Sequence, residues 1–321
     1  MRCWTERFLA LRVVLSSALL THAGCARAAP DPTDGETVGL WDAHSHLSWY
    51  GEAALDSLVR YGVVGVRDVG GDALQLRQWR DDITRGERRG PRSFFAGPVI
   101  DGPKKSTKFC VIVRTADEGR RAVDSLAELG VNFIKTHNGM SPEVYFAVIR
   151  AAHARHLKVA SHLTRGVPVW VAADSGLDSF EHAAESMLSS PLYAGYARTI
   201  EEAKAWWRSP AGDTMLVRLG RQHIVVDPTL VTYRGVAMSY PPGAERDAWL
   251  NTFRFLEELT GRMHRAGIVL LAGSDFVAPG ELVVPGRSLL EEIRLLEESG
   301  LTHREALDAA SINVVRWLEK R

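Results

Sequence analysis

Cysteine is scarce in this chain, and the few cysteines present cannot form a disulfide framework. The 321 residues include three cysteines, and two of them, Cys3 and Cys25, lie within the first thirty positions. The remaining Cys110 sits between Phe109 and Val111, a setting more typical of a small buried hydrophobic side chain than of a nucleophile. One thiol makes no internal disulfide, so the fold must be stabilised by its hydrophobic core.

An excess of charge of either sign is also lacking. Lys and Arg together number 39, and Asp and Glu together number 39. Without a basic field the protein does not recruit nucleic acid or anionic lipid, so we expect a small-molecule partner. Hydrophobic residues make up 45% of the chain and charged residues 24%, which suits a globular protein with a sizeable core.

The apolar run near the N-terminus, residues 13–20, is too short to serve as a permanent membrane anchor. Arginines precede it and Ala26-Arg27-Ala28 follows it, which is the order found in a secretory signal peptide. We therefore predict a signal peptide at residues 1–29 and export to the periplasm or the cell exterior.

Residues 21–25 offer an alternative for the same segment, because they resemble a bacterial lipobox that ends at Cys25. His22 stands where that pattern has leucine, which favours soluble export over lipidation. A membrane association is expected only if Cys25 is lipidated.

Two histidines separated by one residue form the most informative motif of the chain. In an extended backbone side chains alternate between faces, so His44 and His46 point the same way. Residues 38–41 before them read as a short apolar strand, and residues 48–51 after them as an exit loop. Two imidazoles at the end of a strand can hold one metal ion. With eleven histidines in the chain, however, one such pair arises by chance about half the time, so the other ligands decide.

Apolar runs alternate with helical patterns along the rest of the chain. Eight strands are predicted at residues 38–41, 63–66, 93–96, 131–135, 157–162, 176–182, 224–229 and 268–275. Helices are predicted at residues 73–85, 115–129, 141–156, twice within 199–222, and at 244–266, 288–299 and 302–317. Strands that are apolar along most of their length indicate a parallel sheet covered on both faces.

Eight such units match a (β/α)₈ TIM barrel, an α/β fold, which we place at residues 37–321. A doubly wound open sheet is the alternative. The first strand-to-helix turn lacks a G-x-G-x-x-G sequence, which disfavours dinucleotide binding.

Polar side chains follow the predicted strands, at the end of a barrel where chemistry takes place. In chain order they are His44, His46, Arg67, Asp68, Lys135, His162, His182 and Asp275. We interpret Arg67 and Asp68 as a buried ion pair at the barrel mouth. The others are types that can bind a metal or assist in catalysis.

In these stretches the sequence resembles the metal-dependent amidohydrolase superfamily. The resemblance is carried by residues 39–47, 66–71, 133–135, 161–163, 180–182, 272–275 and 306–313, and so covers nearly all of the predicted mature chain. Within the superfamily it is greatest to the imidazolonepropionase- and prolidase-related branch, which includes Xaa-Pro and Xaa-Arg dipeptidases.

The resemblance implies a binuclear metal site that usually holds two Zn²⁺ ions. His44, His46 and Asp275 would bind the first ion, and His162 and His182 the second. Lys135, carbamylated by CO₂, would bridge the two. A metal-activated water would attack the substrate, with Asp275 as general base and acid. Alternatively, Lys135 is an ordinary buried lysine paired with an acid, and His162 and His182 are core histidines.

The implied activity is hydrolysis of a carbon–nitrogen amide bond, with a dipeptide or an N-acyl amino acid as substrate. His137, Tyr233 and Arg234 are candidate substrate-binding residues, because an Arg and a Tyr can pair with a carboxylate. Two alternatives to amide hydrolysis remain. One is an ester hydrolase, a lactonase or phosphotriesterase, and the other is a truncated barrel without catalytic activity. The sequence leaves the oligomeric state open.

Two features depart from the family pattern. The usual accessory β-sandwich is expected to be mostly or wholly missing, because few residues flank the predicted barrel. Leu290 stands where related sequences often have a histidine after Ser-Leu. These departures weaken the inference about substrate but not the inference about metal.

Overall fold

The computed structural model describes residues 39–103, 108–276 and 284–319. The predicted signal peptide and lipobox lie outside these residues. The described residues belong to one compact unit. None of the helices within the described residues has the length and apolar character needed to cross a membrane.

The described residues contain ten strands in two sheets, and every strand pairing is parallel. The first sheet has the order β1-β2-β3 and the second β10-β9-β8-β7-β6-β4-β5. The strands are β1 (Leu40–Ser45), β2 (Val63–Asp68), β3 (Arg92–Phe95), β4 (Val99–Asp101), β5 (Cys110–Ile112), β6 (Ile134–Thr136), β7 (Val159–His162), β8 (Ser179–Glu181), β9 (Val225–Asp227) and β10 (Val269–Leu270).

Backbone hydrogen bonds join the two sheets at both edge strands of the smaller sheet, β1 and β3. The amide of Ala43 in β1 donates to the carbonyl of Ala272, just beyond β10, over 3.0 Å, and the amide of Asp275 donates to the carbonyl of His44 over 2.8 Å. At the other end the amide of Asn132 donates to the carbonyl of Phe95 in β3 over 2.9 Å. The chain therefore has an α/β fold built on parallel strands.

All eight predicted strands are present, and their burial explains why the apolar runs could be recognised. All or nearly all residues of β1, β2, β6 and β8 are buried, as expected for parallel strands covered on both faces. Strands β4 and β5 were not predicted; both lie in the connection between β3 and the next helix, and β5 is only half-buried. Cys110 begins β5 and is half-buried rather than buried.

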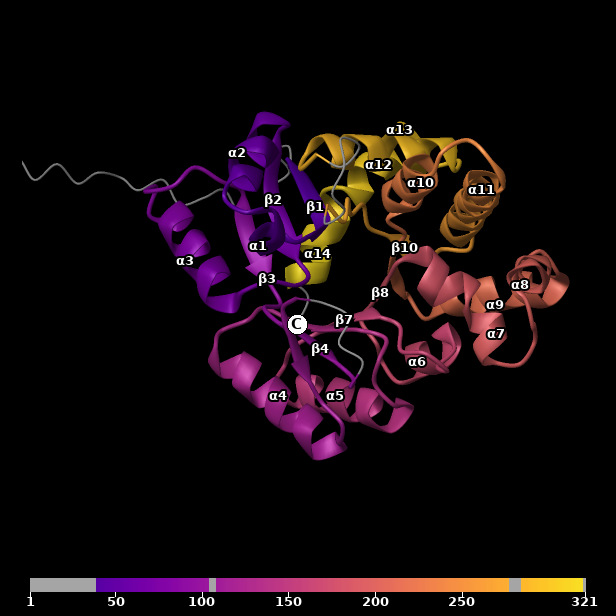
Figure 1. Ribbon diagram of the computed structural model, residues 1–321, viewed down its shortest axis with the longest axis horizontal. Coiled ribbons are helices and arrows are strands. Elements are labelled where there is room, and N and C mark those ends of the chain that lie inside the picture. The colour runs from indigo at the N-terminus through magenta and orange to yellow at the C-terminus, as the bar shows by residue number, and fades with distance from the viewer. Residues whose placement is uncertain (1–38, 104–107, 277–283, 320–321) are drawn as a thin grey trace, which may run out of the picture. The chain divides into compact units, whose positions relative to one another are not determined.

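Fourteen α-helices and one π-helix connect and cover the described strands (Figure 1). The first seven α-helices are α1 (Leu47–Tyr50), α2 (Ala53–Arg60), α3 (Ala73–Thr84), α4 (Ala116–Glu128), α5 (Pro142–Ala154), α6 (Val169–Asp174) and α7 (Ser190–Tyr193). The others are α8 (Ile200–Trp207), α9 (Pro210–Arg221), α10 (Leu230–Ser239), α11 (Ala244–Arg265), α12 (Arg287–Glu298), α13 (His303–Ala309) and α14 (Ile312–Glu319), and the π-helix is η1 (Ala184–Leu188).

Helix starts follow the predicted capping signals. The Thr115 hydroxyl accepts a hydrogen bond from the amide of Glu118, and Ser141 precedes a helix that begins with Pro142. Thr302 and Glu305 form a reciprocal capping box.

Two local predictions were wrong. The segment 48–51 is not wholly a loop, because α1 begins at Leu47. The C-terminal helix does not run unbroken from 302 to 317, because it is interrupted between Ala309 and Ile312. The interruption lets the carbonyls of Ala309 and Ala310 accept hydrogen bonds from Ala272 and Trp41, which places α14 beside β1 (Figure 1).

Candidate metal and active site

The end of β1 brings the two histidines of the HxH motif to Asp275. His44 lies in β1 and is fully buried, and His46 follows the strand. Nε2 of His46 lies 3.4 Å from Oδ1 of Asp275, and Nε2 of His44 lies 3.7 Å from the same oxygen. The two imidazole centroids are 5.4 Å apart.

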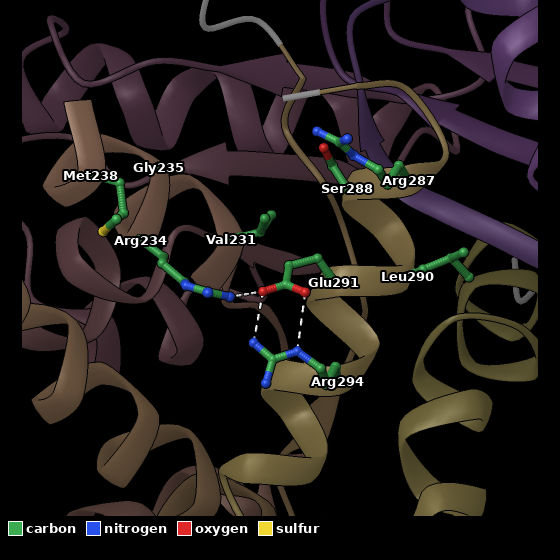
Figure 2. A pocket seen from close by; sticks show the side chains of 9 residues that line it. All are labelled: Val231, Arg234, Gly235, Met238, Arg287, Ser288, Leu290, Glu291 and Arg294. Atoms are coloured by element: carbon green, nitrogen blue, oxygen red, sulfur yellow. Dashed lines mark hydrogen bonds and ion pairs between the residues drawn. The ribbon is translucent and has the colours of Figure 1, made fainter. Parts of the chain in front are cut away.

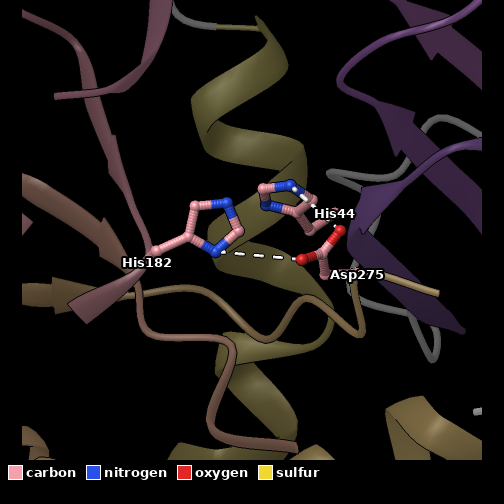
Figure 3. Close-up of side chains that lie close together, drawn as sticks. All are labelled: His44, His182 and Asp275. Carbon is pink, nitrogen blue, oxygen red and sulfur yellow. Dashed lines mark ion pairs between the residues drawn. The ribbon is translucent and has the colours of Figure 1, made fainter. Parts of the chain in front are cut away.

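His182 approaches this group from the end of β8. Its Nδ1 lies 3.9 Å from Oδ2 of Asp275, and its ring centroid is 4.7 Å from that of His44 (Figure 3). The potential ligand atoms of His44, His182 and Asp275 all lie within 4.8 Å of one another, a grouping that could hold a metal ion. His182 and Asp275 both have positive φ, 64° and 45°, which is uncommon outside glycine and often found at functional sites.

His162 and Lys135 lie beside the same group on neighbouring strands. The centroid of His162 is 4.8 Å from that of His182. Lys135 in β6 is 2% exposed, and its charge is close enough to lower the pKa of His44, His162 and His182. The structure therefore gathers all six predicted ligands in one buried region.

Burial sets the protonation of these histidines. Loss of solvent lowers the pKa of His44 to about 4 and that of His182 to about 3, and it lowers the pKa of His162 well below its usual value. Near neutral pH these three imidazoles are uncharged, which is the form that binds a metal.

The pKa values of His46 and Asp275 are shifted by neighbouring side chains as well as by burial, and that of Lys135 is shifted mainly by burial. Burial lowers the pKa of His46, but the Asp275 carboxylate outweighs it and raises the pKa above its usual value. Burial raises the pKa of Asp275, but the three histidines around it lower the pKa below its usual range. Burial also lowers the pKa of Lys135, which increases the fraction of neutral amine.

One imidazole nitrogen in this region is buried without a hydrogen-bond partner. Nδ1 of His44 lies 2.9 Å from Oε2 of Glu181. Burial opposes ionisation of Glu181, but the Arg67 and Lys135 cations hold the pKa of this carboxyl well below its usual range. An ionised carboxylate only accepts, so Nδ1 of His44 carries the hydrogen and Nε2 presents a lone pair toward Asp275.

Glu181 belongs to a buried network that the sequence did not reveal. Arg67 donates from Nη2 to Glu181 over 2.7 Å and from Nε to the carbonyl of Ala43 over 2.6 Å. Oδ2 of Asp227 lies 3.3 Å from Nδ1 of His44 and 3.5 Å from Arg67. Burial and the nearby Glu181 raise the pKa of Asp227 well above its usual value, so of the two carboxyls Glu181 carries the charge.

The predicted ion pair between Arg67 and Asp68 is therefore wrong. Successive residues of a strand face opposite sides, so the two side chains diverge. Asp68 instead accepts hydrogen bonds from the amides of Leu47 and Gly70, over 2.6 and 3.1 Å. Glu181 and Asp227 also end strands, which is the signal that could have identified them.

His137 lies next to the proposed ligands, whereas Tyr233 and Arg234 are held by other groups. The imidazole of His137 stacks on His162, with centroids 4.2 Å apart. Tyr233 is buried and donates a hydrogen bond to the carboxylate of Glu185. Arg234 forms an ion pair with Glu291.

Arg234 lines a pocket of about 480 Å³ between α10 and α12 (Figure 2). Glu291 in this pocket also binds Arg294, over 2.7 and 3.0 Å, and Leu290 lines it as well. Tyr233 and Arg234 thus do not act as a pair in this arrangement, and their role toward a substrate stays a prediction.

Comparisons of the sequence find no match to any protein-family model and none to a curated protein. The structure, in contrast, is similar to many solved structures. One is the bottromycin amidohydrolase, with a TM-score of 0.68 and 23% identity over 88% of this chain and 67% of that protein.

Two further similar structures are a putative prolidase and a Xaa-Pro dipeptidase. A putative prolidase from Bifidobacterium longum has a TM-score of 0.65 and 23% identity over 87% of this chain and 69% of its own. A Xaa-Pro dipeptidase with methionine bound in its active site has a TM-score of 0.64 and 19% identity, over 87% and 75% of the two chains. These neighbours match the branch that the sequence resembles, and this chain has the fold that amidohydrolases and prolidases of known structure share.

Proposed function

We propose that this protein is a binuclear metal-dependent hydrolase of the amidohydrolase superfamily, which cleaves the amide bond of a dipeptide or an N-acyl amino acid. The observation that carries the proposal is the buried Nε2 of His44, which has no hydrogen-bond partner and faces Asp275 over 3.7 Å among further neutral imidazoles. A buried imidazole nitrogen without a partner is unfavourable, and a metal ion would supply that partner. We also propose that the eight predicted strands close into a (β/α)₈ barrel through the backbone bonds on either side of the smaller sheet.

The residues present fit two divalent ions, for which we propose Zn²⁺. His44, His46 and Asp275 would hold one ion, and His162 and His182 the other. When bound, such ions lower the pKa of a water molecule and polarise the carbonyl of the substrate. The neutral imidazoles and the ionised Asp275 offer the nitrogen and oxygen donors that zinc prefers.

Lys135 would link the two halves of the site as a carbamate. Its buried amine has a lowered pKa, and the neutral amine is the form that attacks CO₂. A nitrogen–carbon bond forms and the nitrogen loses a proton, which leaves an anion with two oxygens in place of a cation. In the described part of the chain no carboxylate forms an ion pair with the Lys135 ammonium, which is the partner an ordinary buried lysine requires.

Asp275 is positioned to move the proton of the reaction. Its carboxylate is ionised and lies within 4 Å of His44, His46 and His182. It would accept a proton from the attacking water and transfer it to the leaving nitrogen of the amide. His137, which stacks on His162, would face the substrate. A substrate carboxylate at Tyr233 or Arg234 would have to compete with Glu185 or Glu291.

The test is reconstitution of purified protein with zinc and bicarbonate, followed by metal analysis and an activity screen. We expect two zinc ions per chain and turnover of dipeptides or N-acyl amino acids, with Xaa-Pro dipeptides first in the screen because of the neighbouring prolidases. Lactones and phosphotriesters serve as the ester controls. Fewer than one zinc per chain, or turnover of the esters alone, would overturn the proposal.

Export remains a separate proposal that rests on residues 1–29 alone. Mass spectrometry of the mature N-terminus in cells that export proteins should show cleavage near Ala28, or before Cys25 if the lipobox is used. An intact Met1 would contradict both.

A further inference from the structure

A one-turn helix holds two exposed aromatic side chains beside the proposed metal site. Helix α1 directly follows β1, and its Trp49 and Tyr50 are 38% and 44% exposed. A single exposed aromatic residue is ordinary on a protein surface. A role in binding therefore has to be argued from the groups that Trp49 and Tyr50 contact and from how rigidly α1 is fixed.

Trp49 contacts a proposed metal ligand, and Tyr50 contacts the residue that follows another. The indole of Trp49 meets His46 edge-on, with centroids 6.0 Å apart, and it meets Phe109 in the same way, also at 6.0 Å. Tyr50 packs edge-on against Phe276, the residue after Asp275, at 5.9 Å. We call Trp49, Tyr50 and Phe109 the aromatic rim.

Hydrogen bonds and a buried side chain fix the start of α1. The amide of Leu47 donates to the Asp68 carboxylate over 2.6 Å, and the Leu47 side chain is fully buried. The hydroxyl of Ser48 accepts from the amide of Asp72 over 3.1 Å. Gly71 allows this approach, because a Cβ there would lie 2.8 Å from the Ser48 oxygen. The exposed indole is thus presented by a fixed element.

We infer that the aromatic rim binds an apolar, preferably aromatic, side chain next to the scissile amide of the substrate. The inference deepens the proposed function and rests on it for the position of that amide. His46 contacts both the indole and Asp275, so a substrate whose amide reaches Asp275 would have its adjacent side chain within reach of Trp49. An aromatic side chain there would cover the exposed indole and could adopt the edge-to-face arrangement that the rim rings already make.

The first experiment measures selectivity in the zinc-loaded protein. We compare kcat/KM for Phe-Ala, Ala-Phe and Ala-Ala, and expect one Phe-containing substrate to exceed Ala-Ala by about tenfold or more. Trp49→Ala should abolish this preference and Trp49→Phe should retain most of it. The matched control is Tyr196→Ala, which removes a 58% exposed aromatic residue that stacks on Trp170 and Trp206 and should leave the preference unchanged.

Zinc content and ligand binding separate this inference from the proposed function. Every variant should keep the zinc content of the wild type, and loss of zinc in Trp49→Ala would show that Trp49 acts only through His46. In calorimetry the wild type should bind 3-phenylpropanoate about tenfold more tightly than propanoate, and Trp49→Ala should bind the two equally.

The possible results point to different conclusions. Rim-dependent binding of 3-phenylpropanoate without turnover of any amide would refute the proposed function and leave the aromatic site standing. Turnover of amides with equal kcat/KM for the three dipeptides would refute the aromatic site alone.

Discussion

Nδ1 of His44 lies 2.9 Å from a carboxylate oxygen of Glu181, a residue 137 positions later in the chain, and both side chains are fully buried. The same carboxylate oxygen accepts a hydrogen bond from Arg67 over 2.7 Å. One oxygen thus joins a proposed metal ligand to a buried guanidinium. Since the contact determines which nitrogen of His44 carries hydrogen, it also determines which nitrogen is free for a metal.

Removal of the Glu181 carboxylate should therefore lower both stability and metal affinity. Glu181→Leu leaves Arg67 and Nδ1 of His44 with only the longer contacts to Asp227, at 3.5 and 3.3 Å, and we expect the free energy of unfolding to fall by about 3 kcal/mol. Zinc affinity should fall by about 10- to 100-fold, because His44 is no longer oriented. Denaturant unfolding and zinc titration measure the two effects.

Glu181→Gln and an exposed ion pair serve as controls for that variant. Glutamine keeps an acceptor oxygen but not the charge, so both losses should be smaller than with leucine. The pair of Arg218 and Asp174 is about half exposed on each side, and Asp174→Asn should change stability by less than about 1 kcal/mol. Equal zinc affinity in all three variants would contradict the orienting role of Glu181.

Lys135 and Asp275 should respond differently to substitution. Lys135→Ala should lose metal as well as activity, because the ion at His162 and His182 keeps only two protein ligands. A short carboxylic acid in solution should partly restore turnover by occupying the vacated space. Asp275→Asn keeps an oxygen but removes the proton acceptor, so activity should fall by about 10²–10⁴-fold while much of the metal remains.

Zinc content and turnover, measured on both variants, test the carbamate and the general base together. An ordinary structural lysine predicts another pattern, in which Lys135→Ala lowers thermal stability and leaves the metal stoichiometry intact. Two metals and full activity in Lys135→Ala would show that the carbamate bridge is wrong.

Glu292 should behave as a neutral residue that supports the start of α10. Its two carboxyl oxygens accept from the amides of Leu230 and Val231, over 3.0 and 2.7 Å, and its side chain is fully buried. Burial raises the pKa of Glu292 well above its usual value. Glu292→Gln keeps one of the two acceptor oxygens and should lower the free energy of unfolding by about 1–3 kcal/mol, whereas Glu292→Leu leaves both amides unpaired and should lower it by about twice as much. Thermal unfolding of both variants checks this, and an equal loss in the two would show that the oxygen kept by glutamine supports neither amide.

Asp42 should make stability depend on pH between about 4 and 7. Burial raises the pKa of Asp42 from 3.8 to about 7, although Ser274 and His44 donate hydrogen bonds to it. Because the folded state binds this proton more tightly than the unfolded chain, the contribution of Asp42 is complete below pH 3.8 and is lost as the pH rises to about 7.

Asp42→Asn removes this titration and keeps an acceptor oxygen. Its free energy of unfolding relative to the wild type should rise from about pH 4 to 7, by at most about 1.4 kcal/mol per pH unit, and level off above that. Denaturant unfolding of metal-free protein over this range measures the difference. A difference that does not vary with pH would show that Asp42 titrates alike in both states.

The positions of the strands and the starts of the helices could be predicted from the sequence, because both depend on residues that are close together in the chain. Buried parallel strands are apolar along their length, so the sequence pattern predicts all eight strands. Helix starts could also be predicted, because a capping box is formed by residues three positions apart, as at Thr302 and Glu305. The six proposed ligands could be named because strands that run in parallel end on one side and present their last polar residues together.

Contacts between distant strands were decided only by the tertiary structure. Arg67 pairs with Glu181 instead of the adjacent Asp68, because alternate strand residues face opposite ways and a residue 114 positions away lies closer to the guanidinium. The presentation of Trp49 likewise depends on Asp68 and Asp72, which hold α1 from the following strand and its exit. The sequence by itself determined which residues end the strands, and the packing of those strands determined which of these side chains meet.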